Sequence, residues 1–156
     1  LMILKPVVID NWYNKQELKK VYKELDFYND KDKLVSQHGN VAVEDGRDKA
    51  DCYRVPLSTY YSPEGTKLSD ILTLMHKVRD KKFHDYITKV CGINKEPKKF
   101  TGGNLILPDL KEKIECKNNR LVLIPGMIHH EVTEIKMKGK YKLGDGRYCI
   151  VHFFEG

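Results

Sequence analysis

Two adjacent histidines and one arginine are the residues whose types and positions best suit chemistry. His129 and His130 follow the turn at 125–128 and begin a strand-like run, and Arg147 begins the last strand-like run after a Gly- and Lys-rich stretch. Imidazole is the commonest protein ligand of metals, and a guanidinium binds a carboxylate through two parallel hydrogen bonds. Adjacent strand residues point to opposite faces, so at most one of the two histidines faces the interior. A structural role for each residue alone is the alternative interpretation.

The four cysteines show no paired or metal-binding spacing. Cys52, Cys91, Cys116 and Cys149 form no CxxC motif, and no histidine lies at zinc-finger distance from any of them. Three of the four lie in apolar or strand-like runs. We therefore expect buried free thiols in a reducing, cytoplasmic compartment.

Length and composition indicate a single globular domain, residues 1–156. Hydrophobic residues make up 40% and charged residues 32% of the chain, the balance of a water-soluble protein. No apolar run approaches the roughly 20 residues of a membrane helix, and the start is too short for a signal peptide, so no membrane partner is expected. The net charge of +6 comes mainly from scattered lysines, which favours a solvated surface over nucleic-acid binding.

The first elements of the chain are expected to be a strand and an amphipathic helix. Residues 7–13 predict a short strand that runs into a turn. Asn14 is predicted to be a helix N-cap, with Glu17 at the capping-box position. Leu18, Val21, Tyr22 and Leu25 then recur at helical spacing, which predicts a helix of about 12 residues.

The rest of the N-terminal part, up to residue 90, is expected to give loops and a second helix. Residues 29–66 carry turn and loop chemistry, and residues 52–61 within them predict an ordered connection. The second helix is expected from Leu68 to Val90, with a break near Asp80, because its apolar residues form one stripe. Residues 1–90 would thus support the remainder mainly through helices and loops.

Residues 91–156 are expected to form the β core. Short apolar runs rich in Val and Ile alternate there with Gly and Pro turns, which is typical of strands. Helices first and an antiparallel sheet system second indicate an α+β domain with a jelly-roll or sandwich-like β part. The expected strands lie at 104–107, 113–116, 120–126, 130–135 and 147–154.

The stretch from Ile93 to Phe154 resembles the C-terminal half of the iron- and 2-oxoglutarate-dependent dioxygenases, in particular their prolyl-hydroxylase-like branch. Four motifs match in order: the Gly-Gly-x-Leu of 102–105, the strand and tight turn of 116–126, the His-x-Val of 130–132, and the last strand, GRYCIVHFF. The opening strand and helix, VVIDNWYNKQELKKVYKELDF, are loosely similar to those of the same branch.

This resemblance implies a fold and an activity. The fold would be α+β, with N-terminal helices packed on a double-stranded β-helix, or jelly-roll, core. The activity would be hydroxylation of a protein or peptide side chain. It would use Fe(II), O₂ and the cosubstrate 2-oxoglutarate, with ascorbate as a further cofactor of the family.

The resemblance also assigns site residues. His130 would be a metal ligand, and Arg147 would hold the far carboxylate of 2-oxoglutarate. Val132 and Phe153 would pack along the cosubstrate, and Leu105 would help to keep the pocket dry. The HEV match selects the second histidine of the pair as the one that points into the β core.

The family's upstream His-x-Asp or His-x-Glu pair has no counterpart here, because His38, His76 and His84 all lack a carboxylate two positions later. The first two strands of the family's core are also missing. Either this sequence lacks an internal stretch near residues 80–91, which we favour, or the natural chain does not contain it. The first interpretation predicts a broken or irregular chain between Lys81 and Gly92.

Two other functions stay open. The missing pair motivates a catalytically inactive binding module on the same β scaffold, which would bind a partner in the former substrate groove. The charge of +6 motivates a basic nucleic-acid-binding protein. Metal titration separates the first from an enzyme, and salt-dependent binding to DNA or RNA tests the second.

Overall fold

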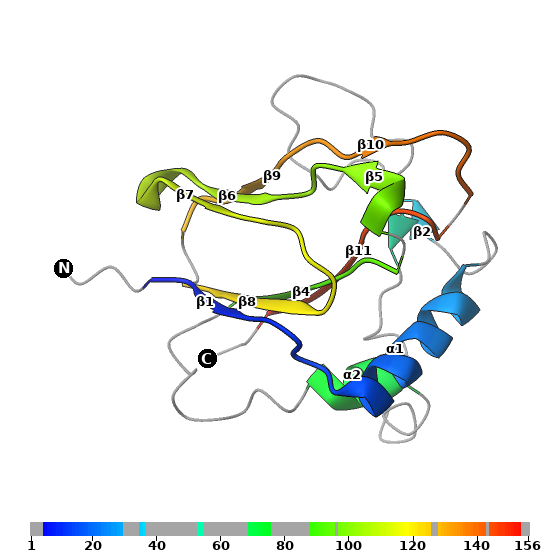
Figure 1. Ribbon diagram of the computed structural model, residues 1–156. Helices are drawn as coiled ribbons and strands as arrows, with labels where there is room; N and C mark the ends of the chain where they lie inside the picture. The colour runs from blue at the N-terminus through cyan, green and yellow to red at the C-terminus, as the bar shows by residue number, and fades with distance from the viewer. Residues whose placement is uncertain are drawn as a thin grey trace.

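The computed structural model describes residues 5–29, 35–36, 53–54, 69–75, 88–95, 97–125, 128–142 and 144–153. Antiparallel strands dominate these residues, and the longest helix follows the first strand, so the fold is mixed α+β (Figure 1). In chain order the elements are β1 (Val7–Ile9), α1 (Lys15–Tyr28), β2 (Val35–Ser36), β3 (Tyr53–Arg54), α2 (Asp70–Met75), β4 (Thr88–Ile93), β5 (Phe100–Thr101), β6 (Leu105–Leu107), β7 (Glu112–Ile114), β8 (Arg120–Ile124), β9 (Glu131–Val132), β10 (Lys136–Met137) and β11 (Tyr148–Phe153).

Two antiparallel sheets form the body of the described structure. The larger has the strand order β1-β8-β4-β11 and the smaller has the order β7-β6-β9, and Figure 1 shows them as two layers. Two short strand pairs, β10-β5 and β2-β3, accompany them. Neighbours within a sheet are distant in sequence: Val122 of β8 pairs with Val8 on one side and with Val90 on the other.

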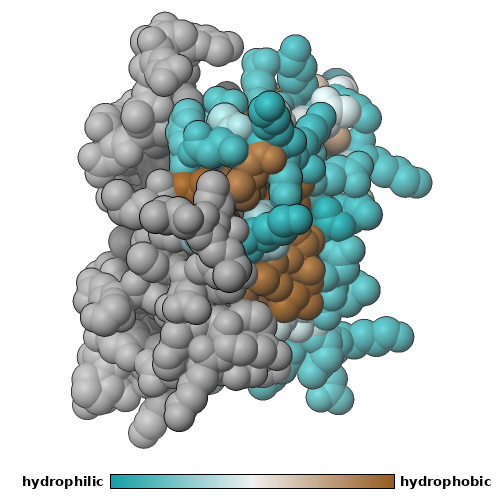
Figure 2. Space-filling view, turned by 90° about the vertical axis from the view of Figure 1, so that its left-hand side faces the viewer, coloured by the Kyte–Doolittle hydropathy of each residue, from teal (hydrophilic) through white to brown (hydrophobic). Residues whose placement is uncertain are grey.

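Strand β8 separates two hydrophobic clusters. Leu121 and Leu123 belong to a cluster with residues of α1 and α2, whereas Val122 and Ile124 belong to a cluster with residues of β6 and β7. Successive strand residues point to opposite faces, so a strand that is buried on both sides needs an uninterrupted apolar run. The sequence LVLI supplies that run. Figure 2 shows two apolar patches among polar residues on the face that lies at the left of Figure 1.

The capping box that the sequence predicts at the start of α1 is confirmed. Asn14 Oδ1 accepts hydrogen bonds from the backbone N–H groups of Gln16 at 3.0 Å and Glu17 at 2.9 Å. In return, Glu17 Oε2 accepts from the Asn14 backbone N–H at 3.0 Å. These bonds satisfy three of the N–H groups that a helix start leaves without intrahelical partners, which fixes the beginning of α1 locally.

The prediction of a helix that continues to Val90 is wrong at its C-terminal end. Within the described residues, α2 covers Asp70–Met75, and Thr88 already begins β4. Strand β4 is paired with β8 on one side and with β11 on the other. Because two neighbours satisfy the backbone hydrogen bonds of such a strand, tertiary pairing overrides the helical spacing of the side chains.

The predicted irregularity between Lys81 and Gly92 is not found where the structure can be described. Residues 81–87 lie outside the described residues. Residues 88–92 form regular antiparallel pairs with both neighbouring strands. The described part of this window is therefore a sheet strand.

Most of the other expected strands are present with shifted ends. The runs at 104–107, 120–126 and 147–154 correspond to β6, β8 and β11, and the run at 113–116 corresponds to β7, which ends at Ile114. The expected strand at 130–135 shrinks to Glu131–Val132. Most of the 52–61 connection lies outside the described residues. No helix in the described part of the chain is long and apolar enough to cross a membrane.

Candidate functional site

A small cavity of about 30 Å³ lies between the two sheets. Gly92 and Val122 line it from the larger sheet, Leu105 and Ile114 line it from the smaller one, and Arg147 precedes β11. The polar part of the lining comes from the connection between β7 and β8 and from the start of β8. It comprises Glu115, Cys116, Lys117 and Arg120. Three cationic side chains therefore surround one small interior space.

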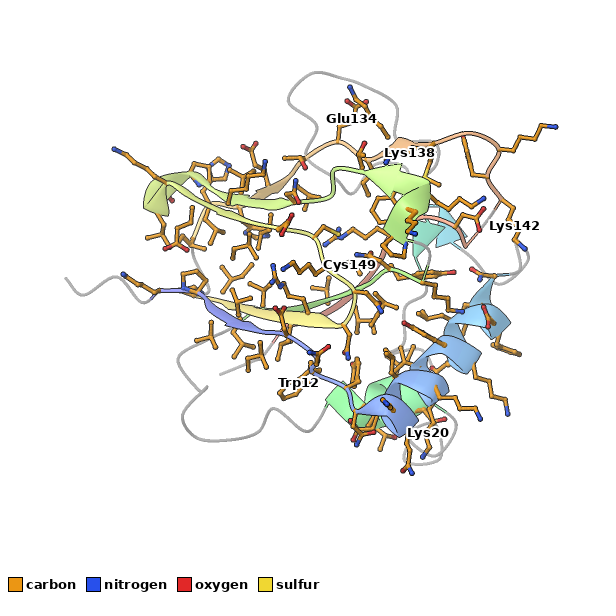
Figure 3. The ribbon with its side chains drawn as sticks, viewed as in Figure 1. Trp12, Lys20, Glu134, Lys138, Lys142 and Cys149 are labelled. Atoms are coloured by element: carbon orange, nitrogen blue, oxygen red, sulfur yellow. The ribbon has the colours of Figure 1, made fainter. Side chains whose placement is uncertain are left out.

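Arg147 is the cation with unused hydrogen-bonding capacity. Its Nε atom is buried and has no hydrogen-bond partner among the described residues, and its Nη2 lies 3.6 Å from Cys149 Sγ. Figure 3 shows Cys149, which lies on β11, between the two layers. A buried N–H without a partner costs about 1–3 kcal/mol, and an anion is its natural acceptor. Arg147 Nε is thus a buried donor without an acceptor among the described residues, on a side chain that lines the cavity.

Arg120 has its donors engaged already. Its Nε and Nη2 donate to the two carboxylate oxygens of Asp10 at 2.5 and 2.8 Å, and its Nη1 donates to the Glu115 carbonyl at 2.9 Å. The hydrogen bond from Arg120 lowers the pKa of Asp10, although desolvation opposes that shift. The same hydrogen bond raises the pKa of Arg120, and the charges of Asp10, Glu115 and Cys116 add to the increase. Arg120 therefore links Asp10, the residue that follows β1, to the start of β8.

Cys116 presents a free thiol to the cavity. Its backbone N–H donates to Asn104 Oδ1 at 2.9 Å, which holds the residue in place after β7. Asn94 Nδ2 donates to its Sγ at 3.2 Å. Cys116 is half-buried and Cys149 is exposed, so the expectation of buried thiols is wrong for these two. The side chains of the other two cysteines lie outside the described residues.

The prediction that His130 points into the β core is wrong in this structure. His130 is exposed, and its Nδ1 lies 3.1 Å from the Ile128 carbonyl oxygen. His129 is exposed as well. The reason lies in the position of β9, which is the outermost strand of its sheet in the described structure. No described strand covers its free edge.

Val132 shows the same effect of an uncovered edge. It pairs directly with Leu105, so both side chains belong to one face of the sheet. Leu105 is only 6% exposed, whereas Val132 is 47% exposed. Leu105 therefore lines the cavity as the resemblance implies, and Val132 lies outside it. Phe153 ends β11, and its side chain lies outside the described residues.

The described residues do not assemble a metal site. No group of three or more His, Cys, Asp or Glu side chains among them could hold a metal ion. A facial iron site needs two histidines and one carboxylate. Within the described ranges, His130 belongs to no such group, so these residues alone do not form the iron site that the resemblance implies.

Arg147 and Leu105, which the resemblance assigns to one site, line the same cavity, but the sequence did not indicate its other polar residues. No motif assigned the other polar lining residues to a site: Glu115, Cys116, Lys117 and Arg120. Only the loop bonds that place residues 115–119 over β4 bring them to the cavity. One of these bonds runs from the Asn119 N–H to the Gly92 carbonyl at 2.9 Å.

Comparison with protein-family models, with curated proteins and with solved structures found no match to this chain.

Proposed function

We propose that this chain is a jelly-roll domain of the iron- and 2-oxoglutarate-dependent dioxygenase type, related to the prolyl-hydroxylase-like branch. In this proposal Arg147 holds the far carboxylate of 2-oxoglutarate in the cavity between the sheets. The observation that carries the proposal is the buried Arg147 Nε, which has no partner among the described residues. The proposed reaction is hydroxylation of a protein or peptide side chain with O₂ as the oxidant.

The winding of the chain supports the scaffold. After β4, in the larger sheet, the chain forms β6 and β7 in the smaller sheet and returns to the larger one with β8. It then visits the smaller sheet with β9 and the larger one with β11. Alternation between two antiparallel sheets is the connectivity that a double-stranded β-helix requires. Helix α1 lies on the outer face of the larger sheet, where Val21 and Leu25 share a cluster with Leu121.

The geometry of Arg147 supports a carboxylate ligand. A guanidinium fork forms two parallel bonds with a carboxylate, and such charge-assisted bonds are among the strongest in proteins. The cavity of about 30 Å³ holds one or two waters and is too small for a dicarboxylate. Binding therefore needs the polar wall to move. Glu115 and Lys117, which form an exposed ion pair at 3.7 Å, are the side chains that can swing outward.

The metal part of the proposal rests on the sequence resemblance. Among the described residues, His130 belongs to no group of three or more His, Cys, Asp or Glu side chains that could hold a metal ion. No reaction step through iron is derived for this chain. What the structure supports is the binding of the cosubstrate carboxylate by Arg147.

Binding and turnover of 2-oxoglutarate test this proposal. Calorimetric titration should detect 2-oxoglutarate binding to the wild-type protein, with at least about tenfold weaker binding for Arg147→Gln. Lys142→Gln is the matched control, because Lys142 is an exposed cation outside the cavity lining (Figure 3). With added Fe(II), the wild type should convert 2-oxoglutarate to succinate. Absence of both binding and turnover would reject the proposal.

A non-catalytic binding module on the same scaffold is the second candidate. The exposed position of His130 and the absence of a metal-binding group among the described residues favour it. Such a module would keep the Arg147 cavity and lack catalysis. Titration with Fe(II) under anaerobic conditions separates the candidates: a tight site for one iron per chain contradicts the non-catalytic module.

A further inference from the structure

The Cys116 thiol and the Arg147 side chain meet at Gly103. A Cβ atom added at residue 103 would lie 3.0 Å from Arg147 Cδ and 3.4 Å from Cys116 Sγ. Both side chains therefore border the same small volume above a glycine. A sulfur attached to Cys116 Sγ would therefore lie close to the Arg147 side chain.

Two polar atoms beside this volume lack partners among the described residues. Asn94 is only 2% exposed, and its carboxamide lies against Cys116 Sγ with Oδ1 left without a hydrogen-bond partner. On the other side, Arg147 Nε is buried and also lacks a partner. Buried polar groups are normally satisfied, so exceptions point to a missing ligand or solvent group. Here the missing groups are one donor for Asn94 Oδ1 and one acceptor for Arg147.

The charges around the thiol favour an anionic reagent. Lys117, Arg120 and Arg147 line the cavity with Cys116, and Glu115 is the one carboxylate among the lining residues. Cationic, partly exposed surroundings are those in which cysteines react. The half-buried Cys116 meets that description.

We propose that Cys116 is a modification site that forms a mixed disulfide with small acidic peptide disulfides of the glutathione type, and that the adduct excludes a carboxylate ligand from Arg147. A carboxylate of such a reagent would supply the acceptor that Arg147 Nε lacks among the described residues. The modification itself is independent of the proposed function. Its effect on 2-oxoglutarate binding rests on that function.

The covalent step is a thiol–disulfide exchange. Cys116 loses its proton to solvent, and the thiolate sulfur attacks one sulfur of the reagent. The new sulfur–sulfur bond forms as the bond within the reagent breaks, and the second half of the reagent leaves as a thiolate. Cys116 is oxidised and one half of the reagent is reduced, so electrons and atoms balance.

Site-resolved labelling tests the modification without any ligand. Folded protein is treated with glutathione disulfide or with the neutral reagent iodoacetamide, and labelling of Cys116 is quantified by peptide mass spectrometry. Cys116 should react with both. Lys117→Gln should slow the reaction with the anionic disulfide by about twofold to threefold more than the reaction with iodoacetamide, as expected for one charge within about 8 Å in water, because loss of the cation disfavours the thiolate equally for both reagents. Lys142→Gln is the control and should leave both rates unchanged.

Binding after modification tests the exclusion. Wild-type and Cys116→Ser proteins are both treated with glutathione disulfide and then titrated with 2-oxoglutarate. Treatment should abolish binding by the wild type. The untreated affinity of Cys116→Ser is measured first, because residue 116 lines the cavity, and treatment should leave that affinity unchanged. Cys149→Ser, treated in the same way, should lose binding like the wild type, which excludes Cys149 as the cause.

Each result decides between the alternatives. An unreactive Cys116 in folded protein, or equal effects of Lys117→Gln on the charged and neutral reagents, would overturn the modification site. Undiminished binding after complete labelling of Cys116 would overturn the exclusion. If untreated protein fails to bind 2-oxoglutarate, the proposed function fails, and the labelling rates alone then decide whether Cys116 is the modification site.

Discussion

Arg147 lies so close to Gly103 that the glycine determines where the arginine can go. A Cβ atom at residue 103 would stand 3.0 Å from Arg147 Cδ, which is tighter than ordinary contact. Gly103 also adopts φ +73°, a backbone conformation that other residues rarely adopt. The predicted Gly-Gly-x-Leu motif thus has a physical role in this structure, because it leaves room for the guanidinium to enter between the sheets.

Gly103→Ala should therefore weaken both folding and ligand binding. Gly139 is a matched control, because it has φ +63° but no atom within 4 Å of a Cβ added there. Gly139→Ala should lower the free energy of unfolding by about 1–2 kcal/mol, the cost of left-handed backbone alone. Gly103→Ala should lower the free energy of unfolding by more than this. The fraction of the Gly103→Ala variant that folds should also bind 2-oxoglutarate more weakly than the Gly139→Ala variant does. Denaturant unfolding and calorimetry measure the two effects, and equal behaviour of the variants would contradict the contact.

Arg147→Lys should retain the fold and lose most of the carboxylate affinity. Lysine keeps the positive charge but cannot reproduce the two parallel hydrogen bonds of the fork. Hydrogen bonds to charged groups contribute about 1.5–3 kcal/mol, so the dissociation constant of 2-oxoglutarate should rise by about 10- to 100-fold. The melting temperature should change little, since Arg147 Nε makes no hydrogen bond in the described structure. An unchanged dissociation constant would remove Arg147 from the site.

The ion pair of Asp10 and Arg120 should make stability depend on acid pH. The hydrogen bond that the Asp10 carboxylate accepts from Arg120 lowers the pKa of Asp10 in the folded state. When the pKa of a carboxyl group is lower in the folded protein than in the unfolded chain, the charged group stabilises the folded state at a pH above the unfolded pKa. This stabilisation is lost as the pH falls through the folded pKa. The melting temperature of Asp10→Asn should lie below that of the wild type near neutral pH, and the difference should shrink below about pH 4. Two melting curves that stay parallel down to about pH 2 would contradict this assignment.

Asn119→Asp should strongly destabilise the fold. Asn119 Oδ1 accepts from the Tyr13 backbone N–H at 2.8 Å, and its Nδ2 donates to the Tyr13 carbonyl at 2.7 Å. An aspartate cannot donate and would place a buried charge beside that carbonyl, so the free energy of unfolding should fall by about 2–4 kcal/mol. Asn11→Asp is the control, because Asn11 is exposed and also has positive φ. Similar losses for both variants in denaturant unfolding would contradict the role of the Tyr13 bonds.

Local patterns were sufficient to predict the elements whose causes are local. The capping residues Asn14 and Glu17 define the start of α1 through bonds that span three residues. The apolar run at 121–124 predicts a buried strand because both of its faces need apolar side chains. Arg147 and Leu105, predicted from sequence to share a site, do line one cavity.

Elements that depend on distant partners could not be predicted in the same way. Val90 has neighbours at helical spacing, yet it lies in a strand because β8 and β11 pair with its backbone on both sides. His130 is expected to alternate with its neighbours, but it precedes β9, the outermost described strand of its sheet, and residues 129–132 are all exposed. Cys116 reaches the cavity only through the loop that leads from β7 to β8. The sequence determines which local structure each segment prefers. The tertiary structure decides whether the segment adopts it, because strand pairing and the burial of side chains depend on residues far away in the chain.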